Sequence, residues 1–125
     1  MKKLNTLAGC LAIIALSCSK KSEDIITPPP TGGSCDTVNM KYAANVTPIL
    51  QANCYSCHGT SSNGGSNGVI LEGYSNLKIK ADNGQLIGVI AHADGFSAMP
   101  QGRAKLSDCN INIIRSWINN GTKNN

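Results

Sequence analysis

Aromatic and charged residues are both scarce in this chain of 125 residues. Aromatic side chains make up 4% of it, with a single Trp and a single Phe, and Asp, Glu, Lys and Arg together make up 14%. A small domain with so few large side chains buries little apolar surface, so we expect a disulfide, a metal or a bound cofactor to complete its core. The six cysteines favour the same conclusion.

Long apolar runs are also absent, since the longest extends from Leu7 to Leu16 with Gly9 and Cys10 inside it. It follows Lys2 and Lys3 and is too short to span a bilayer, which is typical of a secretory signal. We therefore expect residues 1–17 to be a signal peptide and the protein to be exported. The formal net charge is +4, and two of these charges belong to the signal. What remains is too weak to indicate binding of nucleic acid.

The end of this segment, Ala15-Leu16-Ser17-Cys18, resembles the lipobox of bacterial lipoproteins, in which a cysteine is lipidated and becomes the first residue. The segment ending at Cys10 matches that pattern better, but it would leave an apolar run of about five residues, shorter than the roughly 7–15 of a signal. We expect lipidation of Cys18 and a membrane-anchored lipoprotein that faces the periplasm or the cell surface. The alternative is an ordinary cleaved signal followed by a free thiol.

Residues 18–34 combine charged side chains with the prolines Pro28, Pro29 and Pro30. Such a composition cannot bury enough surface to fold, and the prolines stiffen an extended tether. We interpret this segment as the lipidated N-terminus and a flexible linker. Residues 35–125 then form one small domain.

The pattern of residues 35–125 predicts an all-α domain, because no strand-like alternation longer than four residues occurs in it. Thr47 is expected to cap a first helix with Pro48 at its first position. Residues 75–81 and 85–92 are expected to form two short helices separated by Asn83-Gly84. Ser107 is expected to cap a last helix, which Gly121 ends. That helix has apolar residues spaced for one face, namely Ile111, Ile114, Trp117 and Ile118.

Cys54-Tyr55-Ser56-Cys57-His58 has the pattern Cys-x-x-Cys-His, which is typical of covalent haem attachment in c-type cytochromes. On a helical turn, positions i, i+3 and i+4 share one face. The two thiols can therefore bond the two vinyl groups of one haem while the imidazole of His58 faces the iron. Two other interpretations use the same cysteines. A structural zinc site would need four ligands, and a thioredoxin-like redox pair would need a strand and helix context.

The chain from Cys35 to Gly121 resembles a class I c-type cytochrome domain of bacterial lipoproteins. The matching features are residues 46–50, residues 54–59, Ala98-Met99-Pro100 with Gly102, and Leu106-Ser107 before the helix with Trp117. The resemblance implies a small helical domain wrapped around one haem c, with Met99 as the second axial ligand of the iron. It also implies one-electron exchange with redox partner proteins such as a dehydrogenase, a quinone-linked complex or an oxidase.

Cys35 and Cys109 remain once the other cysteines are assigned to the signal, the lipid and the haem. In an oxidising compartment we expect them to form a disulfide. The alternative is two buried free thiols.

Four single residues have two interpretations each, and for Trp117 these are core packing and an electron relay. His92 is either an alternative sixth ligand of the iron or a solvent-facing residue near a helix end. Arg103 and Lys105 either pair with a haem propionate or an acidic partner, or lie in solvent. Trp117 is expected in the core.

The sequence predicts an electron-transfer haem protein and not an enzyme, since no catalytic base or nucleophile stands out. A competing hypothesis is a peroxidase-like or gas-binding haem protein with an open or His-ligated sixth position. A third is a tethered module that serves one partner enzyme.

Overall fold

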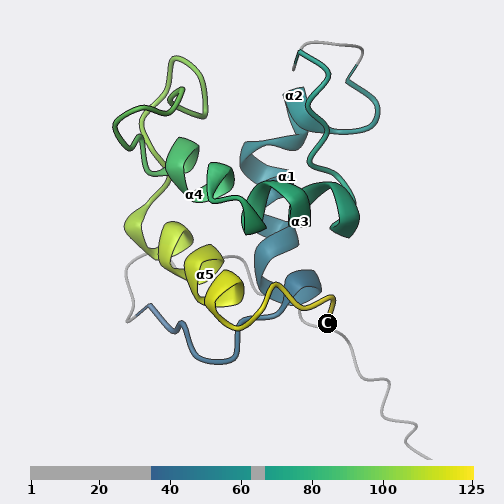
Figure 1. Ribbon diagram of the computed structural model, residues 1–125, viewed down its shortest axis with the longest axis vertical. Helices are drawn as coiled ribbons and strands as arrows, with labels where there is room; N and C mark the ends of the chain where they lie inside the picture. The colour runs from purple at the N-terminus through teal and green to yellow at the C-terminus, as the bar shows by residue number, and fades with distance from the viewer. Residues whose placement is uncertain (1–34, 63–66) are drawn as a thin grey trace, which may run out of the picture.

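The computed structural model describes residues 35–62 and 67–125. The predicted signal peptide and linker, including Cys10 and Cys18, lie outside the described residues. Within the described ranges the chain forms helices and no β-strand, which confirms the expected all-α class (Figure 1). None of these helices is long and apolar enough to cross a membrane. The helices are η1 (Tyr42–Val46), which is a π-helix, α1 (Thr47–Asn53), α2 (Tyr55–His58), α3 (Tyr74–Asp82), α4 (Gln85–Ile90) and α5 (Asp108–Asn119).

The first helical segment begins at Tyr42, upstream of the predicted start at Thr47. Helix η1 runs directly into α1, so Thr47 lies inside a continuous helical stretch and does not cap it. Its hydroxyl instead donates to the carbonyl oxygen of Tyr42 at 3.0 Å. The prediction failed here because Thr-Pro is a local signal for a helix start, whereas the preceding residues were already helical.

Helices α3 and α4 are joined at Asn83-Gly84, as the sequence predicts. Gly84 has φ +78°, a left-handed conformation in which glycine avoids the strain that a β-carbon would cause. Helix α4 ends at Ile90 rather than at His92. His92 has φ +54° and therefore lies outside the helix, in a conformation that histidine adopts more readily than most residues.

Helix α5 forms as predicted between its two end signals. The hydroxyl of Ser107 accepts a hydrogen bond from the backbone N–H of Asn110 at 3.2 Å, and Gly121 follows the helix with φ +90°. Trp117 is fully buried, which confirms its place in the core. Its indole N–H donates to the carbonyl oxygen of Lys123 at 2.8 Å, so the polar atom of this core side chain is satisfied.

The core lies where α5 packs against η1 and against α4 (Figure 1). At the first contact the rings of Tyr42 and Trp117 have centroids 5.9 Å apart. Apolar side chains from all the longer helices complete it, namely Val46, Ile49, Leu50, Leu77, Leu86, Ile90, Ile111 and Ile114.

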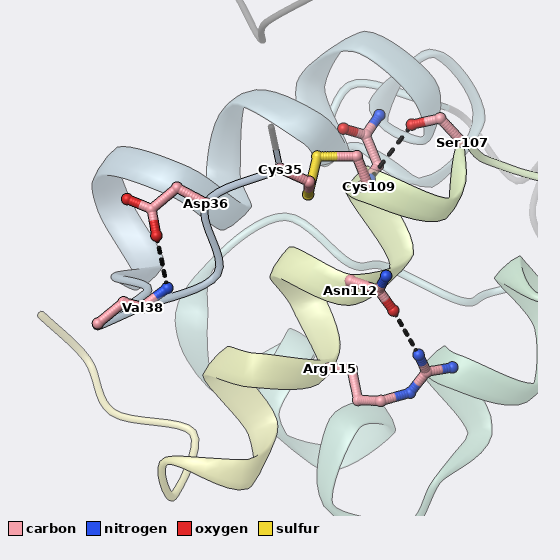
Figure 2. Close-up of a disulfide and its surroundings, with 8 residues drawn as sticks. Cys35, Asp36, Val38, Ser107, Cys109, Asn112 and Arg115 are labelled. Carbon is pink, nitrogen blue, oxygen red and sulfur yellow. Dashed lines mark hydrogen bonds between the residues drawn. A yellow bond between two sulfur atoms is a disulfide. The ribbon is translucent and has the colours of Figure 1, made fainter. Parts of the chain in front are cut away.

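A disulfide joins Cys35, where the described chain begins, to Cys109 in the first turn of α5 (Figure 2). The two Cα atoms are 5.6 Å apart, which is an ordinary separation for a disulfide. The structure thus contains the cross-link that the count of leftover cysteines predicts. Further along α5 the hydroxyl of Ser116 donates to the carbonyl oxygen of Thr37 at 2.6 Å. The entry segment is therefore fixed to α5 at two points.

Candidate functional site

The Cys-x-x-Cys-His motif forms a single helical turn. The backbone N–H groups of Cys57 and His58 both donate to the carbonyl oxygen of Cys54, at 3.1 and 2.8 Å. This turn brings Cys54, Cys57 and His58 to one side of the chain, as the spacing predicts. Gly59 follows it because a β-carbon there would lie 2.6 Å from the carbonyl oxygen of Tyr55. The glycine lets the chain leave the turn without a clash.

His58 is held in one orientation by the segment that follows residues 60–68, whose sequence is typical of a glycine-rich loop. Its Nδ1 lies 2.9 Å from the carbonyl oxygen of Val69, and its own carbonyl oxygen accepts from the N–H of Leu71 at 2.8 Å. A carbonyl oxygen can only accept, so Nδ1 carries the proton in this hydrogen bond. The unprotonated Nε2 is then available as a ligand, and such a bond to the other ring nitrogen is typical of metal-bound histidines.

The motif opens onto a cavity of about 700 Å³, within the range of ordinary cofactor sites. Cys54, Cys57 and His58 line it, and so does Met99 from the loop before α5. The structure therefore brings together the four residues that the sequence predicts as haem-binding residues. The apolar wall of the cavity is formed by Val69, Leu71, Leu86, Val89, Ile90, Pro100 and Leu106. Uncharged polar residues line it as well, namely Asn53, Ser56, Asn67, Gln85, Ser97 and Gln101.

Cys54 and Cys57 are not part of a disulfide in the structure. Burial raises the pKa of the Cys54 thiol to about 11, so the thiol is protonated at neutral pH. A thioredoxin-like pair uses the thiolate, so this environment disfavours that interpretation. In residues 35–62 and 67–125 no three side chains among His, Cys, Asp and Glu are grouped so that they could hold a metal ion.

Of the two candidate sixth ligands, the structure brings Met99 to the cavity and gives His92 another contact. Nε2 of His92 lies 3.0 Å from the carbonyl oxygen of Met99. Among the described residues that line the cavity, His92 is not found. The histidine therefore contacts the backbone of the loop that carries Met99.

The two basic residues that could pair with a haem propionate, Arg103 and Lys105, lie in different surroundings. Arg103 lines the cavity, whereas Lys105 forms an exposed ion pair with Asp108 in the first turn of α5. Lys80, at the C-terminal end of α3, lines the cavity as well. Nothing in the local pattern around Lys80 separates it from an ordinary surface lysine, so the sequence did not predict its place at the cavity.

A contact between Thr60 and Glu72, which the sequence did not indicate, links the chain just after the motif to the segment before α3. The carboxylate of Glu72 accepts from both the backbone N–H and the hydroxyl of Thr60, each at 2.6 Å. These two hydrogen bonds lower the pKa of Glu72. They join the two ends of the glycine-rich loop, and so help to bring Val69 to the imidazole of His58.

Comparison of the chain with models of known protein families found no match, and comparisons with curated proteins and with solved structures found none either. The site geometry and the sequence motif are therefore the basis for a functional assignment.

Proposed function

We propose that this protein is an exported c-type cytochrome that transfers single electrons through one covalently bound haem. The observation that supports this most strongly is the convergence of Cys54, Cys57, His58 and Met99 on one cavity of about 700 Å³. The first three residues are close in sequence, but Met99 is on a separate loop. Their meeting is thus a property of the fold and not of the motif alone.

The residues around the cavity fit a haem in five respects. Two unpaired thiols lie one helical turn apart, and the imidazole of His58 has its Nε2 free for iron. The thioether of Met99 would hold the iron together with His58. The apolar wall suits the porphyrin ring, and the side chains of Lys80 and Arg103 carry the charge that the propionate carboxylates would need.

The bound haem supplies the iron that cycles between the ferrous and ferric states. The chain controls that chemistry through its own groups. The hydrogen bond to Val69 fixes the ring of His58, and the apolar wall would pack against the porphyrin ring. A thioether on the other side favours the ferrous state and so raises the reduction potential. These properties suit a carrier between a dehydrogenase or quinone-linked complex and an oxidase.

The proposed location is outside the cytoplasm, at a membrane surface. It depends on Cys18 as the lipidated residue and on residues 18–34 as the tether, and both lie outside the described residues. The disulfide between Cys35 and Cys109 agrees with such an oxidising compartment.

The test is to produce the full chain in a bacterial host that matures c-type cytochromes and to measure its mass after denaturation. We expect one haem that acid and organic solvent do not extract. The variants Cys54→Ala and Cys57→Ala should each lose one thioether bond, and the double variant should release all its haem on denaturation. Ser61→Ala, which changes an exposed residue outside the cavity, is the control and should keep the haem. A bare polypeptide mass for the wild type, or bound zinc, would show the proposal to be wrong.

A further inference from the structure

The loop between α4 and Met99 is held against the last turn of α4 by backbone hydrogen bonds. The N–H of Ala93 donates to the carbonyl oxygen of Gly88 at 3.0 Å, and the N–H of Met99 donates to that of Val89 at 3.0 Å. The ring of Phe96 also lies directly over Gly88, since a β-carbon built on Gly88 would be 2.5 Å from it. The loop is therefore attached to α4 before it reaches the cavity.

The side chain of His92 forms a further contact with the backbone of Met99. Because the carbonyl oxygen of Met99 can only accept, Nε2 of His92 donates its proton in the 3.0 Å contact. Both backbone groups of Met99 are thus engaged, its N–H with Val89 and its C=O with His92. The left-handed backbone of His92, with φ +54°, turns the chain immediately after α4.

We propose that His92 is a positioning residue for Met99, which fixes the backbone of this methionine so that its sulfur stays at the haem iron. This inference rests on the proposed function. A methionine side chain has three rotatable bonds and adapts easily to its surroundings. Fixing its backbone lowers the entropic cost of keeping the sulfur bound. His92 acts through the Met99 carbonyl oxygen and not as a ligand, since Met99 lines the cavity and His92 is not found among the described residues that do.

Two substitutions separate the hydrogen bond from the backbone conformation. His92→Gly removes the donor and suits the left-handed backbone at φ +54°. His92→Gln keeps an N–H donor at a similar reach but is less suited to that conformation. If the hydrogen bond positions Met99, this effect is lost in His92→Gly and kept in His92→Gln. If the left-handed backbone at His92 positions Met99 instead, the effect is kept in His92→Gly and lost in His92→Gln.

The experiment uses the full-length ferric holoprotein and measures three quantities. These are the weak far-red absorption band of a methionine–iron bond, the reduction potential, and the affinity for added imidazole. For His92→Gly we expect a weaker band, a lower potential and imidazole binding that is about fivefold tighter, the effect of losing one neutral hydrogen bond. For His92→Gln we expect values close to those of the wild type.

The possible results distinguish this inference from the proposed function. If the wild type carries no covalent haem or lacks the band, the proposed function or its Met99 ligand is wrong, and the role of His92 is wrong with it. If the wild type has both but His92→Gly matches it in all three quantities, only the inference is overturned. Loss of the band in His92→Gln with its retention in His92→Gly also overturns the inference, because it assigns the effect to the backbone.

Discussion

The hydroxyl of the buried Thr122 donates a hydrogen bond of 2.8 Å to the carboxylate of Asp82, at the end of α3. Lys78, one turn earlier in the same helix, donates to that carboxylate at 2.6 Å and to the Thr122 hydroxyl at 3.0 Å. The hydroxyl of Tyr74 donates to the Thr122 carbonyl oxygen at 2.7 Å. These contacts attach the C-terminal segment to α3.

The first prediction concerns the pH dependence of this attachment. The hydrogen bonds from Lys78 and then Thr122 lower the pKa of Asp82 below its ordinary value. The carboxylate therefore stabilises the fold above the unfolded pKa of about 4, and this stability is lost as the pH falls through the lower folded pKa. Urea unfolding between pH 2 and about 6 should show a smaller loss of stability with acid in Asp82→Asn than in the wild type.

The matched control for this measurement is Asp94→Asn, which changes an exposed carboxylate that forms no ion pair among the described residues. Its acid-side slope should follow that of the wild type. Because Asp82 is exposed, high salt should weaken the effect. Identical slopes for Asp82→Asn and the wild type would contradict the prediction.

The second prediction concerns the axial methionine. Met99→Ala should abolish the far-red band of the ferric protein, lower its reduction potential and let added cyanide or imidazole bind the iron, because it removes the only thioether that lines the cavity among the described residues. Met40 is the other methionine among the described residues and is buried in the core. Met40→Leu should therefore leave the band and the potential unchanged, with a stability loss below about 1.5 kcal/mol. A Met99→Ala protein with the wild-type potential would rule out Met99 as the ligand.

The third prediction concerns the disulfide between Cys35 and Cys109, which closes a loop with a sequence separation of 74. Replacing both residues with Ala should lower the free energy of unfolding by on the order of 4 kcal/mol in the chain-entropy model. Denaturant unfolding of the holoprotein measures this loss, and peptide mapping without reductant should recover the cross-linked pair from the wild type. Recovery of two alkylated thiols instead would refute the cross-link.

The sequence was a sufficient guide at several positions where the signal was local, although the cap at Thr47 was predicted wrongly. Ser107 and the buried Trp117 were predicted because a cap and an apolar face depend on a few neighbouring residues. The motif from Cys54 to His58 was predicted for the same reason, since one helical turn determines its geometry.

Contacts between distant residues could not be predicted in this way. The bond from His58 to Val69 depends on how a glycine-rich loop returns, which no residue pattern specifies. No glycine or proline lies between the end of α4 at Ile90 and His92, so the local sequence does not predict the left-handed turn of His92 or its contact with Met99. The lining of the cavity likewise comes from four helices and two loops that meet only in the folded chain.

The fourth prediction concerns the membrane anchor and rests on the sequence alone. Cys18→Ala should move the protein from the membrane fraction to the soluble fraction, because one lipidated cysteine carries the whole attachment. Cys10→Ala should stay in the membrane fraction, since that cysteine is expected to leave with the signal. Fractionation followed by immunoblotting measures both variants. The reverse outcome would assign the lipid to Cys10.

The fifth prediction concerns Gly88, in the buried face of α4, where the usual stability difference between alanine and glycine should be reversed. Alanine in a helix interior is normally more stable than glycine by roughly 0.5–1 kcal/mol. At this position, however, the new β-carbon would lie 2.5 Å from the ring of Phe96, so the ring and its loop would have to move. Gly88→Ala should therefore destabilise the wild type and weaken the far-red band, because the displaced loop carries Met99.

In a Phe96→Ala background the obstacle is absent, and Gly88→Ala should instead stabilise the protein by roughly 0.5–1 kcal/mol. Phe96 itself is 44% exposed, so its removal leaves the core largely intact. A double-mutant cycle of urea unfolding isolates the coupling between the two residues, which should favour the native pair of glycine and phenylalanine. If Gly88→Ala has the same sign and size in both backgrounds, the ring of Phe96 does not press on α4, and the loop is held by its hydrogen bonds alone.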